Sequence, residues 1–352
     1  WYGVTVEGSP KRVTQLKIGP SRLDGEIPVE LGRLSKLKVL SLADNRLSGG
    51  IPSELGDLYE LEELSLSKNR LDGAIPSQLG NLTSLERLSL SDNRLSGGMP
   101  PELGQLLNLD HLSLSNNRLT GEIPAEFGML TELTYLSLTN NRVTGAIPAE
   151  IGNLTELRYL RLSDNSLSGA IPSELGGLVQ LRHLHLSRNQ LSGAIPAELG
   201  SLSSLTLLHL SDNDLTGMIP TELGGLSNLT ELYLSRNGLT GEIPSELGSL
   251  AKLVQLYLPR NELTGEIPAE LDNLENLTFL FLGGNQLTGC VPVGLKDVAN
   301  NDLSQLNLPD CEAETSMFLD PRESHGGLEG GPGGASNAPI YLDGLVGLRR
   351  PL

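Results

Sequence analysis

The chain has 352 residues and a formal net charge of −18, with 41 glycines, 21 prolines and only 3 % aromatic residues. An excess of acidic groups repels phosphate backbones and anionic lipid headgroups, which argues against nucleic-acid or membrane-surface binding as the main function. No apolar run approaches the roughly 18–20 residues that span a bilayer, so the sequence predicts no membrane insertion in this chain.

One pattern of 24 residues repeats along most of the sequence. Asparagine recurs at this spacing at Asn45, Asn69, Asn93, Asn117, Asn141, Asn165, Asn189, Asn213, Asn237, Asn261 and Asn285. Ser21 holds the same slot one unit earlier, which gives twelve units, and a clear example is LEELSLSKNRLDGAIPSQLGNL at residues 61–82. A fixed period of this length is typical of a solenoid, in which each unit packs only on its neighbours.

Each recurring residue of the unit predicts one part of a coil. Leu64 and Leu66 alternate around an outward residue, which is the period of a short strand with one buried face. We expect Asn69 to bond the open backbone groups of adjacent coils in a ladder. Pro76 predicts an extended segment near a second, weaker strand. The following Leu-Gly-x-Leu predicts a short helical or 3₁₀ turn on the convex side. The predicted fold is therefore an α/β solenoid of about twelve coils, with a parallel β-sheet on its concave face.

These residues resemble the plant-type leucine-rich repeat, LxxLxLxxNxLxGxIPxxLGxL, over residues 13–292. Such repeats occur in ectodomains of plant receptor-like kinases and receptor-like proteins, in secreted inhibitors of cell-wall pectinases, and in secreted bacterial and algal proteins. The opening WYGVTVEGSPKRVTQLKI resembles the N-terminal cap of that family, with Val6 where the family has cysteine. The resemblance implies a right-handed leucine-rich-repeat superhelix, a secreted or cell-surface (extracytoplasmic) location, and ligand binding, but it does not specify the ligand.

The two ends of the chain depart from the repeat. We assign residues 1–20 to an N-terminal cap and first strand, 21–292 to the repeats, 293–311 to a C-terminal capping half-repeat, and 312–352 to a flexible Gly/Pro-rich tail or linker. The half-repeat rests on LSQLNLPDC, residues 303–311, which keeps L-x-x-L-x-L and places Cys311 in the ladder slot. We expect a Cys290–Cys311 disulfide worth about 3 kcal/mol, with two free buried thiols as the alternative. A disulfide would indicate an oxidising compartment.

Two columns of outward residues run along the predicted sheet. The column between the strand leucines changes from Lys17 and five serines to Arg161, His185, His209, Tyr233, Tyr257 and Phe281. The column two residues earlier contains Tyr135, Tyr159, His183 and Phe279. Large aromatic and imidazole groups on a solvated face are typical of a binding hot spot, so we predict that these ten residues bind the ligand. The alternative is that cross-strand ring pairs only stabilise the sheet.

The sequence gives less support for metal binding, catalysis or glycan binding. His183, His185 and His209 lie close together and could bind a transition metal, but no carboxylate or cysteine is clearly placed as a further ligand, so we predict no metal site and no cofactor. No nucleophile–base–acid set, phosphate loop or metal-spaced Cys/His motif stands out from the repeat, so we predict that the chain is not an enzyme. An arginine column from Arg22 to Arg142 could bind an acidic glycan; the alternative is a solvated rim balanced by adjacent aspartates.

The sequence therefore predicts an extracytoplasmic recognition module that binds a protein or peptide on its concave face between Tyr135 and Phe281. One alternative is the sensing ectodomain of a membrane receptor whose transmembrane part or kinase is missing from this chain. A further alternative is a secreted carbohydrate- or ice-binding protein. That protein would use the arginine column or the hydroxyl row Ser67, Ser91, Ser115 and Thr139.

Overall fold

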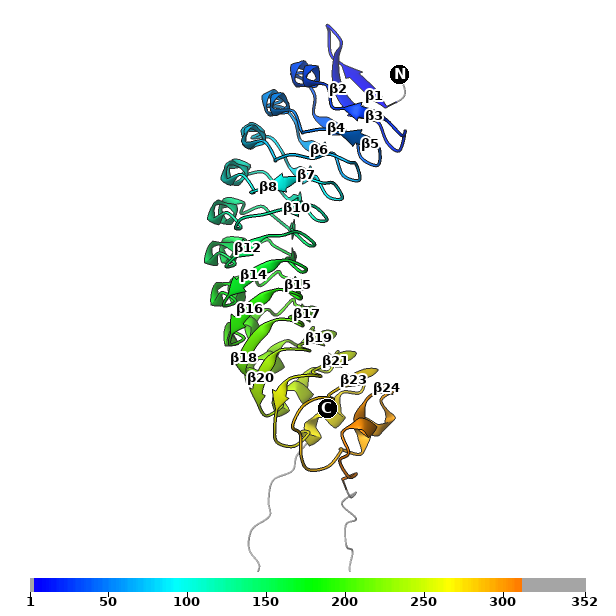
Figure 1. The fold of residues 1–352 in the computed structure, drawn as a ribbon, viewed down its shortest axis with the longest axis vertical. Coiled ribbons are helices and arrows are strands. Elements are labelled where there is room, and N and C mark those ends of the chain that lie inside the picture. The colour runs from blue at the N-terminus through cyan, green and yellow to red at the C-terminus, as the bar shows by residue number, and fades with distance from the viewer. Residues whose placement is uncertain (1–2, 312–352) are drawn as a thin grey trace, which may run out of the picture. The chain divides into compact units, whose positions relative to one another are not determined.

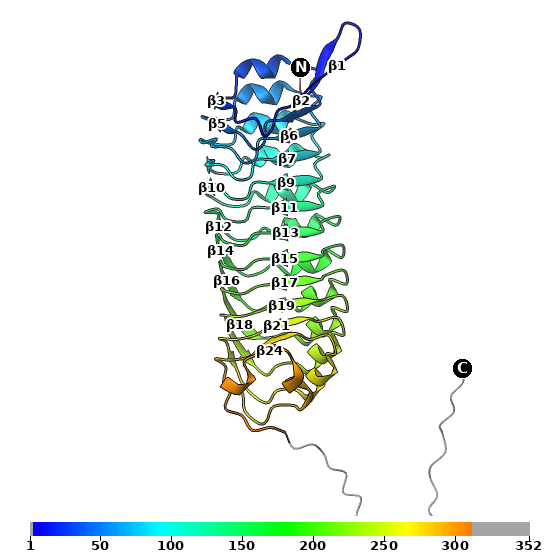
Figure 2. The same ribbon diagram turned by 90° about the vertical axis from the view of Figure 1, so that its right-hand side faces the viewer.

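The computed structural model describes residues 3–311, which form a solenoid of stacked coils (Figures 1 and 2). The main sheet lies on one side of the coils and short helices lie on the other (Figure 1). Within these residues the main sheet has fourteen strands, in the order β1 (Val4–Glu7), β2 (Arg12–Lys17), β4 (Val39–Ser41), β6 (Glu63–Ser65), β7 (Arg87–Ser89), β9 (His111–Ser113), β11 (Tyr135–Ser137), β13 (Tyr159–Arg161), β15 (His183–His185), β17 (Leu207–His209), β19 (Glu231–Tyr233), β21 (Gln255–Tyr257), β23 (Phe279–Phe281) and β24 (Asn300–Asn301).

The strands of the main sheet keep one register along the array. From β2 to β24 all neighbours are parallel, and equivalent leucines pair directly, as Leu40 does with Leu64 and Leu64 with Leu88. Strand β1 instead pairs antiparallel with β2. Because the register is constant, each outward position forms a straight column across the sheet.

The return half of each coil contains short strands and 3₁₀ helices. The short strands are β3 (Asp24–Glu26), β5 (Arg46–Ser48), β8 (Ser96–Gly97), β10 (Arg118–Leu119), β12 (Thr144–Gly145), β14 (Ser166–Gly169), β16 (Gln190–Gly193), β18 (Asp214–Met218), β20 (Gly238–Gly241) and β22 (Glu262–Leu263). The helices are η1 (Val29–Arg33), η2 (Ser53–Asp57), η3 (Ser77–Asn81), η4 (Pro101–Gln105), η5 (Ala125–Met129), η6 (Ala149–Asn153), η7 (Ser173–Gly177), η8 (Ala197–Ser201), η9 (Thr221–Gly225), η10 (Ser245–Ser249), η11 (Ala269–Asn273), η12 (Gly294–Asp297) and η13 (Leu303–Gln305). The second strand and the 3₁₀ turn predicted from the repeat are thus confirmed, and none of the described helices could cross a bilayer.

Stacked leucine columns fill the space between the two halves of each coil. In one coil Leu64, Leu66, Leu71 and Leu79 have no exposed surface, and Ile75 is 3 % exposed. The helices pack so closely that a Cβ on Gly104 would lie 2.4 Å from the carbonyl oxygen of Glu126 in the next coil, which explains the glycine after this leucine. One unit alone could not bury these leucines, so the array is stabilised by its interfaces.

The asparagine ladder is confirmed. The Nδ2 of Asn69 donates to the carbonyl oxygens of Leu42 and Leu66, each at 3.0 Å, and its Oδ1 accepts from the Leu47 N–H at 3.0 Å. The same three bonds recur at Asn213, with Leu186, Leu210 and Leu191 as partners. A single side chain therefore satisfies backbone groups that the turn would leave unpaired.

The C-terminal end differs from the sequence prediction. Cys290 and Cys311 form a disulfide with a Cα–Cα distance of 4.9 Å. However, the last strand is Asn300–Asn301, and the predicted strand region LSQLNL begins with the 3₁₀ helix Leu303–Gln305. Phe279 pairs with Asn300, a separation shorter than the 24-residue period because only residues 298–299 separate η12 from β24, whereas residues 274–278 separate η11 from β23.

The assignment of Cys311 to the ladder slot is therefore wrong. Asp302, which is 7 % exposed, satisfies the open edge of the last full coil. Its Oδ1 and Oδ2 accept from the N–H groups of Leu282 and Gly283, each at 2.8 Å. In earlier coils a carbonyl oxygen of the following coil accepts the bond from the equivalent leucine N–H, as Ser89 does from Leu66. The predicted tail, residues 312–352, lies outside the described residues.

Candidate ligand-binding face

Each three-residue strand of the main sheet, from β4 to β23, buries its central leucine and turns its two outer residues away from the core. In β15 the buried residue is Leu184, and His183 and His185 are half-buried on the outer face. His183 pairs with Tyr159 and His185 with Arg161 on the neighbouring strand β13. The two columns inferred from the repeat therefore lie side by side on one face.

Ten rings on this face form a continuous series, here called the ring track. It joins His111, Tyr135, Tyr159, His183, His185, His209, Tyr233, Tyr257, Phe279 and Phe281, with successive centroids 4.4–6.5 Å apart. Between His183 and His185, whose centroids are 5.8 Å apart, the track crosses from the column of Tyr135 and Tyr159 to the column between the strand leucines. Ring pairs of this spacing add about 0.5–1.5 kcal/mol each, so the track also stabilises the sheet.

The ring track contains nine of the ten residues predicted to bind ligand and adds His111. The His111 ring is stacked on Tyr135 at 4.4 Å with an interplanar angle of 7°. Its place in the same column was visible in the sequence, but the predicted patch began one strand later. The structure thus brings all ten predicted residues onto one face, and their role in binding stays a prediction.

Arg161, the tenth predicted residue, lies over the start of the ring track. Its guanidinium carbon is 5.7 Å from the ring centroid of Tyr135 and 5.8 Å from that of Tyr159, as in cation–π contacts. Its Nε is buried and makes no hydrogen bond within the described residues. The charge is therefore held against two ring faces rather than against a carboxylate.

The histidines of the ring track are held in the neutral form. Burial lowers the pKa of His185 to about 4, and the positive charge of Arg161 adds to the effect. Burial also lowers the pKa of His183 and of His209 from the ordinary value. These imidazoles therefore act as neutral donors and acceptors near pH 7.

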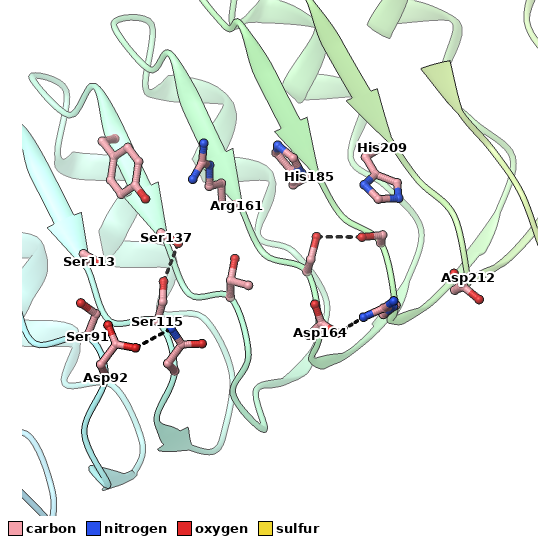
Figure 3. A pocket seen from close by; sticks show the side chains of 16 residues that line it. Ser91, Asp92, Ser113, Ser115, Ser137, Arg161, Asp164, His185, His209 and Asp212 are labelled. Atoms are coloured by element: carbon pink, nitrogen blue, oxygen red, sulfur yellow. Dashed lines mark hydrogen bonds and ion pairs between the residues drawn. The ribbon is translucent and has the colours of Figure 1, made fainter. Parts of the chain in front are cut away.

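A polar groove of about 630 Å³ lies beside the central part of the ring track (Figure 3). Figure 3 shows Arg161, His185 and His209 in a row on adjacent strands, above a floor of hydroxyl groups that includes Ser115 and Ser137. The hydroxyls of Ser115 and Ser137 are 2.6 Å apart. Large cationic and imidazole side chains thus face a floor of short hydroxyls.

The carboxylates along the lower rim of the groove are paired with the next coil. Asp92 accepts from Asn116 at 2.8 Å, and Asp164 pairs with Arg188 at 3.2 Å. Asp212 pairs with Arg236 at 3.3 Å. The sequence indicated that such aspartates balance the column from Arg22 to Arg142. Within residues 3–311 none of those arginines lies within 4.0 Å of a carboxylate oxygen, so they form no direct ion pairs, and the balance of charge along this rim stays a prediction.

The C-terminal end of the ring track is more apolar and is anchored by one tyrosine hydroxyl. Tyr233 donates to Glu231 at 3.0 Å, and its hydroxyl lies 2.6 Å from Oε1 of Gln255 on the next strand. Burial and the hydrogen bond to Glu231 raise the Tyr233 pKa, so the phenol stays protonated. Over the described residues, no group of three or more His, Cys, Asp or Glu side chains is arranged to hold a metal ion.

Known proteins that are similar to this chain share its repeat architecture. A family model described as leucine-rich repeat region matches residues 92–194 and 119–239, and one described as leucine rich repeat matches 35–95 and 59–119. The chain is 33 % identical to an LRR protein of Leptospira interrogans over 78 % of its own length and 79 % of the other's, with a TM-score of 0.53. This chain belongs to the leucine-rich-repeat proteins.

Two plant structures resemble this leucine-rich-repeat chain in different ways. The plant peptide hormone receptor RGFR1, solved in complex with RGF2, is 36 % identical over 86 % of this chain, with a TM-score of 0.74. This chain spans 56 % of that receptor's length. A plant ice-binding protein is 27 % identical, with a TM-score of 0.56, and the match covers 89 % of this chain and 88 % of that one. The comparison with curated proteins found no match.

Proposed function

We propose that this leucine-rich-repeat chain is an extracytoplasmic recognition module that binds a protein or peptide along the ring track of its concave face. The observation that carries the proposal is the continuity of that track from His111 to Phe281 in a chain with only 3 % aromatic residues. Rings of limited flexibility offer a large contact area at a small entropic cost, as binding hot spots do.

The orientation of the rings favours a peptide over a sugar. Tyr257 is stacked on Tyr233 with an interplanar angle of 26° and on Phe281 with one of 17°. Stacked neighbours occupy the ring faces, which a sugar would need for stacking, and leave the ring edges for the ligand. Ring edges carry partial positive charge and suit carbonyl oxygens, of which an extended peptide has one per residue.

Two features support a location outside the cytoplasm. The Cys290–Cys311 disulfide is of the kind that persists in oxidising compartments. The similar receptor RGFR1 was solved with RGF2 bound. Since this chain spans about half of that receptor's length, a sensing ectodomain of a larger membrane receptor is the second form of the same proposal. A membrane-spanning segment encoded in the same reading frame would decide for the receptor form.

The test is selection of a displayed random-peptide library on the purified protein. The variant Tyr159→Ala/His185→Ala/Tyr233→Ala removes rings from three strands of the track and should lose the selected peptides. The matched control Lys17→Ala/Ser41→Ala/Ser65→Ala changes outward residues of the same sheet face near the N-terminal end and should keep them. Binding that survives the ring variant, with both variants folded by circular dichroism, would overturn the proposal.

Ice binding is the second candidate, because the chain covers most of a plant ice-binding protein. The hydroxyl row proposed from the sequence does not support it, since Ser67 is 9 % exposed and bonds Ser89 at 2.6 Å and Ser91 at 3.1 Å. Hydroxyls held in this way are poorly placed to order external water. A thermal-hysteresis assay tests this candidate, and a glycan array tests acidic-glycan binding by the Arg22–Arg142 column.

A further inference from the structure

A second groove, of about 1220 Å³, lies on the return half of four successive coils, and none of its lining residues belongs to the main sheet. It runs between the C-terminal ends of β16, β18 and β20 and the 3₁₀ helices η9 and η10. It extends from Ala194 to Pro268 and is here called the flank groove. This groove and the ring track are therefore built from different residues of the coil.

One wall of the flank groove comes from a column that changes character along the array. At the position after the positive-φ glycine, three successive coils have the small residues Ala146, Ala170 and Ala194. The next three coils have the larger residues Met218, Glu242 and Glu266. Met218 is 69 % exposed, and a Cβ on Gly241 would lie 2.8 Å from its Cγ. The Met218 side chain therefore lies across the next coil with its thioether open to solvent.

The carboxylates of the flank groove have no counter-ion. The four that line it are all exposed and belong to Glu222, Glu242, Glu246 and Glu266. Within residues 3–311 no Lys, Arg or His nitrogen lies within 4.0 Å of any of them. The hydroxyls of Thr221 and Ser245 donate to Glu222 and Glu246, at 3.3 and 3.4 Å, but a neutral hydroxyl leaves the charge in place. The groove is thus negatively charged along both of its walls.

The surface between these carboxylates is apolar and rigid. Ile219 and Ile243, each 2 % exposed, lie at its base, and it is lined by Pro220, Pro244 and Pro268. Proline has a fixed φ and no N–H, so these three positions supply no backbone donor. Nearer the N-terminus, the same part of the coil forms a smaller groove of about 560 Å³ lined by Glu122 and Ala146. Only the larger of these two grooves combines an exposed methionine with carboxylates on both walls.

We propose that the flank groove docks an extended basic segment of a partner protein. An apolar side chain of that segment lies against Met218 and the prolines, and lysine or arginine side chains on either side of it contact the glutamates. Methionine is flexible and polarisable, so it adapts to the apolar side chain that covers it. The net charge of −18 draws a cationic segment toward the chain and raises its rate of association.

The chemistry of the flank groove selects against other occupants. Nucleic acids and anionic lipid surfaces are repelled by its four glutamates. A neutral sugar supplies no cation to pair with them. A small polyamine pairs with the carboxylates but leaves Met218 and the prolines uncovered. A second copy of this chain carries the same net charge of −18.

The experiment adds the blocked peptide acetyl-KLKLK-amide to the protein labelled with carbon-13 at its methionine methyl groups. NMR follows the Met218 signal, which is the one that Met218→Ala removes. Met129, exposed on η5, and the buried Met99 are internal controls. We expect the probe to shift the Met218 signal and neither control. Its affinity should fall as salt rises from about 0.01 M to about 0.15 M, because the Debye length shortens from about 30 Å to about 8 Å.

Variants that copy the residue of other coils test each half of the groove. Met218→Ala reproduces Ala194 and should weaken probe binding about fivefold in calorimetry, because apolar burial is lost. Glu242→Ala/Glu266→Ala should weaken it about tenfold and remove most of the salt dependence. The matched control Glu122→Ala makes the same change in the smaller groove and should bind the probe like the parent protein.

Two further probes and one further measurement complete the test. Binding of acetyl-KGKGK-amide or acetyl-ELELE-amide as tight as that of acetyl-KLKLK-amide would overturn the inference, and so would an unmoved Met218 signal. A dimer in sedimentation that Met218→Ala dissociates would assign the groove to a second copy instead.

This inference goes beyond the proposed function and stands apart from it. The ring variant Tyr159→Ala/His185→Ala/Tyr233→Ala should still bind acetyl-KLKLK-amide at Met218. Loss of the selected peptides in that variant, with no probe binding in the parent protein, would end this inference alone. Probe binding at Met218 in a protein whose ring variant keeps the selected peptides would end the proposed function alone.

Discussion

The two ends of the main sheet have the same scaffold and different outer faces. Asn69 near the N-terminal end and Asn213 near the C-terminal end make the same three backbone hydrogen bonds. In the column between the strand leucines, however, Ser41 and Ser65 are replaced by Tyr233 and Tyr257. Stability is therefore carried by columns that repeat, and the columns that vary are those to which we assign the proposed recognition.

This separation has a physical basis. Buried positions stack on their own equivalents in the next coil, so a change in one coil disturbs two interfaces. Outer positions touch only their cross-strand neighbours, where changes cost a fraction of a kcal/mol to about 1 kcal/mol. The ring track could therefore be placed on β9 to β23 without altering the coils beneath it.

The largest expected effect tests whether a buried leucine contributes equally to the free energy of unfolding at the two ends of the sheet. Leu64→Ala and Leu232→Ala each remove a side chain with no exposed surface. Each should lower the free energy of unfolding by about 3 kcal/mol, from lost burial and the cavity left behind. Urea unfolding followed by circular dichroism measures it, with Leu107→Ala, an exposed leucine, as the control. A difference of more than about 1 kcal/mol between the two core variants would contradict the uniform scaffold.

The next effect concerns the ladder. Asn69→Ala and Asn213→Ala each leave one N–H, of Leu47 and Leu191, without its partner, and they remove one of the two asparagine donors from each of two carbonyl oxygens. Each should cost about 2 kcal/mol, because unsatisfied buried groups carry their full desolvation penalty. Hydrogen exchange should quicken at Leu47 and Leu191 respectively, and Ser65→Ala should change neither. Protection unchanged at those amides would show that the ladder is dispensable.

A pH effect should belong to the part of the sheet that carries the ring track. The folded-state pKa of His185 lies near 4, below the ordinary 6.5. Its contribution to stability is therefore present above pH 6.5 and is lost as the pH falls from about 6.5 to about 4. The loss should be at most about 2 kcal/mol after allowance for solvent screening. His185→Gln should flatten the fall of the melting temperature over that range, and Ser65→Ala should keep the parent slope.

The smallest effect tests how far the ring track stabilises its own sheet. Tyr233→Phe keeps the stacked ring and removes the hydroxyl that contacts Glu231 and Gln255. The expected loss is about 1 kcal/mol. The double variant Tyr233→Phe/Gln255→Ala should add less than the sum of the two single changes. Full additivity in thermal unfolding would mean that the contact between Tyr233 and Gln255 contributes nothing.

The scaffold could be predicted from sequence because the same type of residue recurs at each buried position of the repeat. Leucine, asparagine and proline recur where the strand, the ladder and the extended turn require them, so the register followed from the 24-residue spacing. The last coil was mispredicted because the segment between its helix and its strand is shorter, which brings Asn301 rather than a leucine opposite Leu280. The capping role of Asp302 therefore had no signal in the repeat.

The outer face was predictable only as a list of residues on shared columns. Ring planes, such as the 76° between Tyr159 and His183, depend on side-chain rotamers that periodicity does not determine. The sequence also did not show that Arg161 forms no ion pair within residues 3–311, or that Asp164 pairs with Arg188. Column analysis therefore located the face, and side-chain geometry was needed to describe its chemistry.

The ladder hydrogen bonds all point from one coil to the coil before it. This polarity determines where repeat units can be removed or added. Each asparagine reaches back to the coil before it, as Asn69 does to Leu42 and Leu47. Removing whole 24-residue units from the interior would rejoin identical surfaces, and a protein engineer could shorten the serine-faced end in this way. A cut between Asn285 and Asp302 would instead expose the N–H groups of Leu282 and Gly283. Residues 293–311 should therefore be kept as the C-terminal cap of any shortened, lengthened or chimeric array.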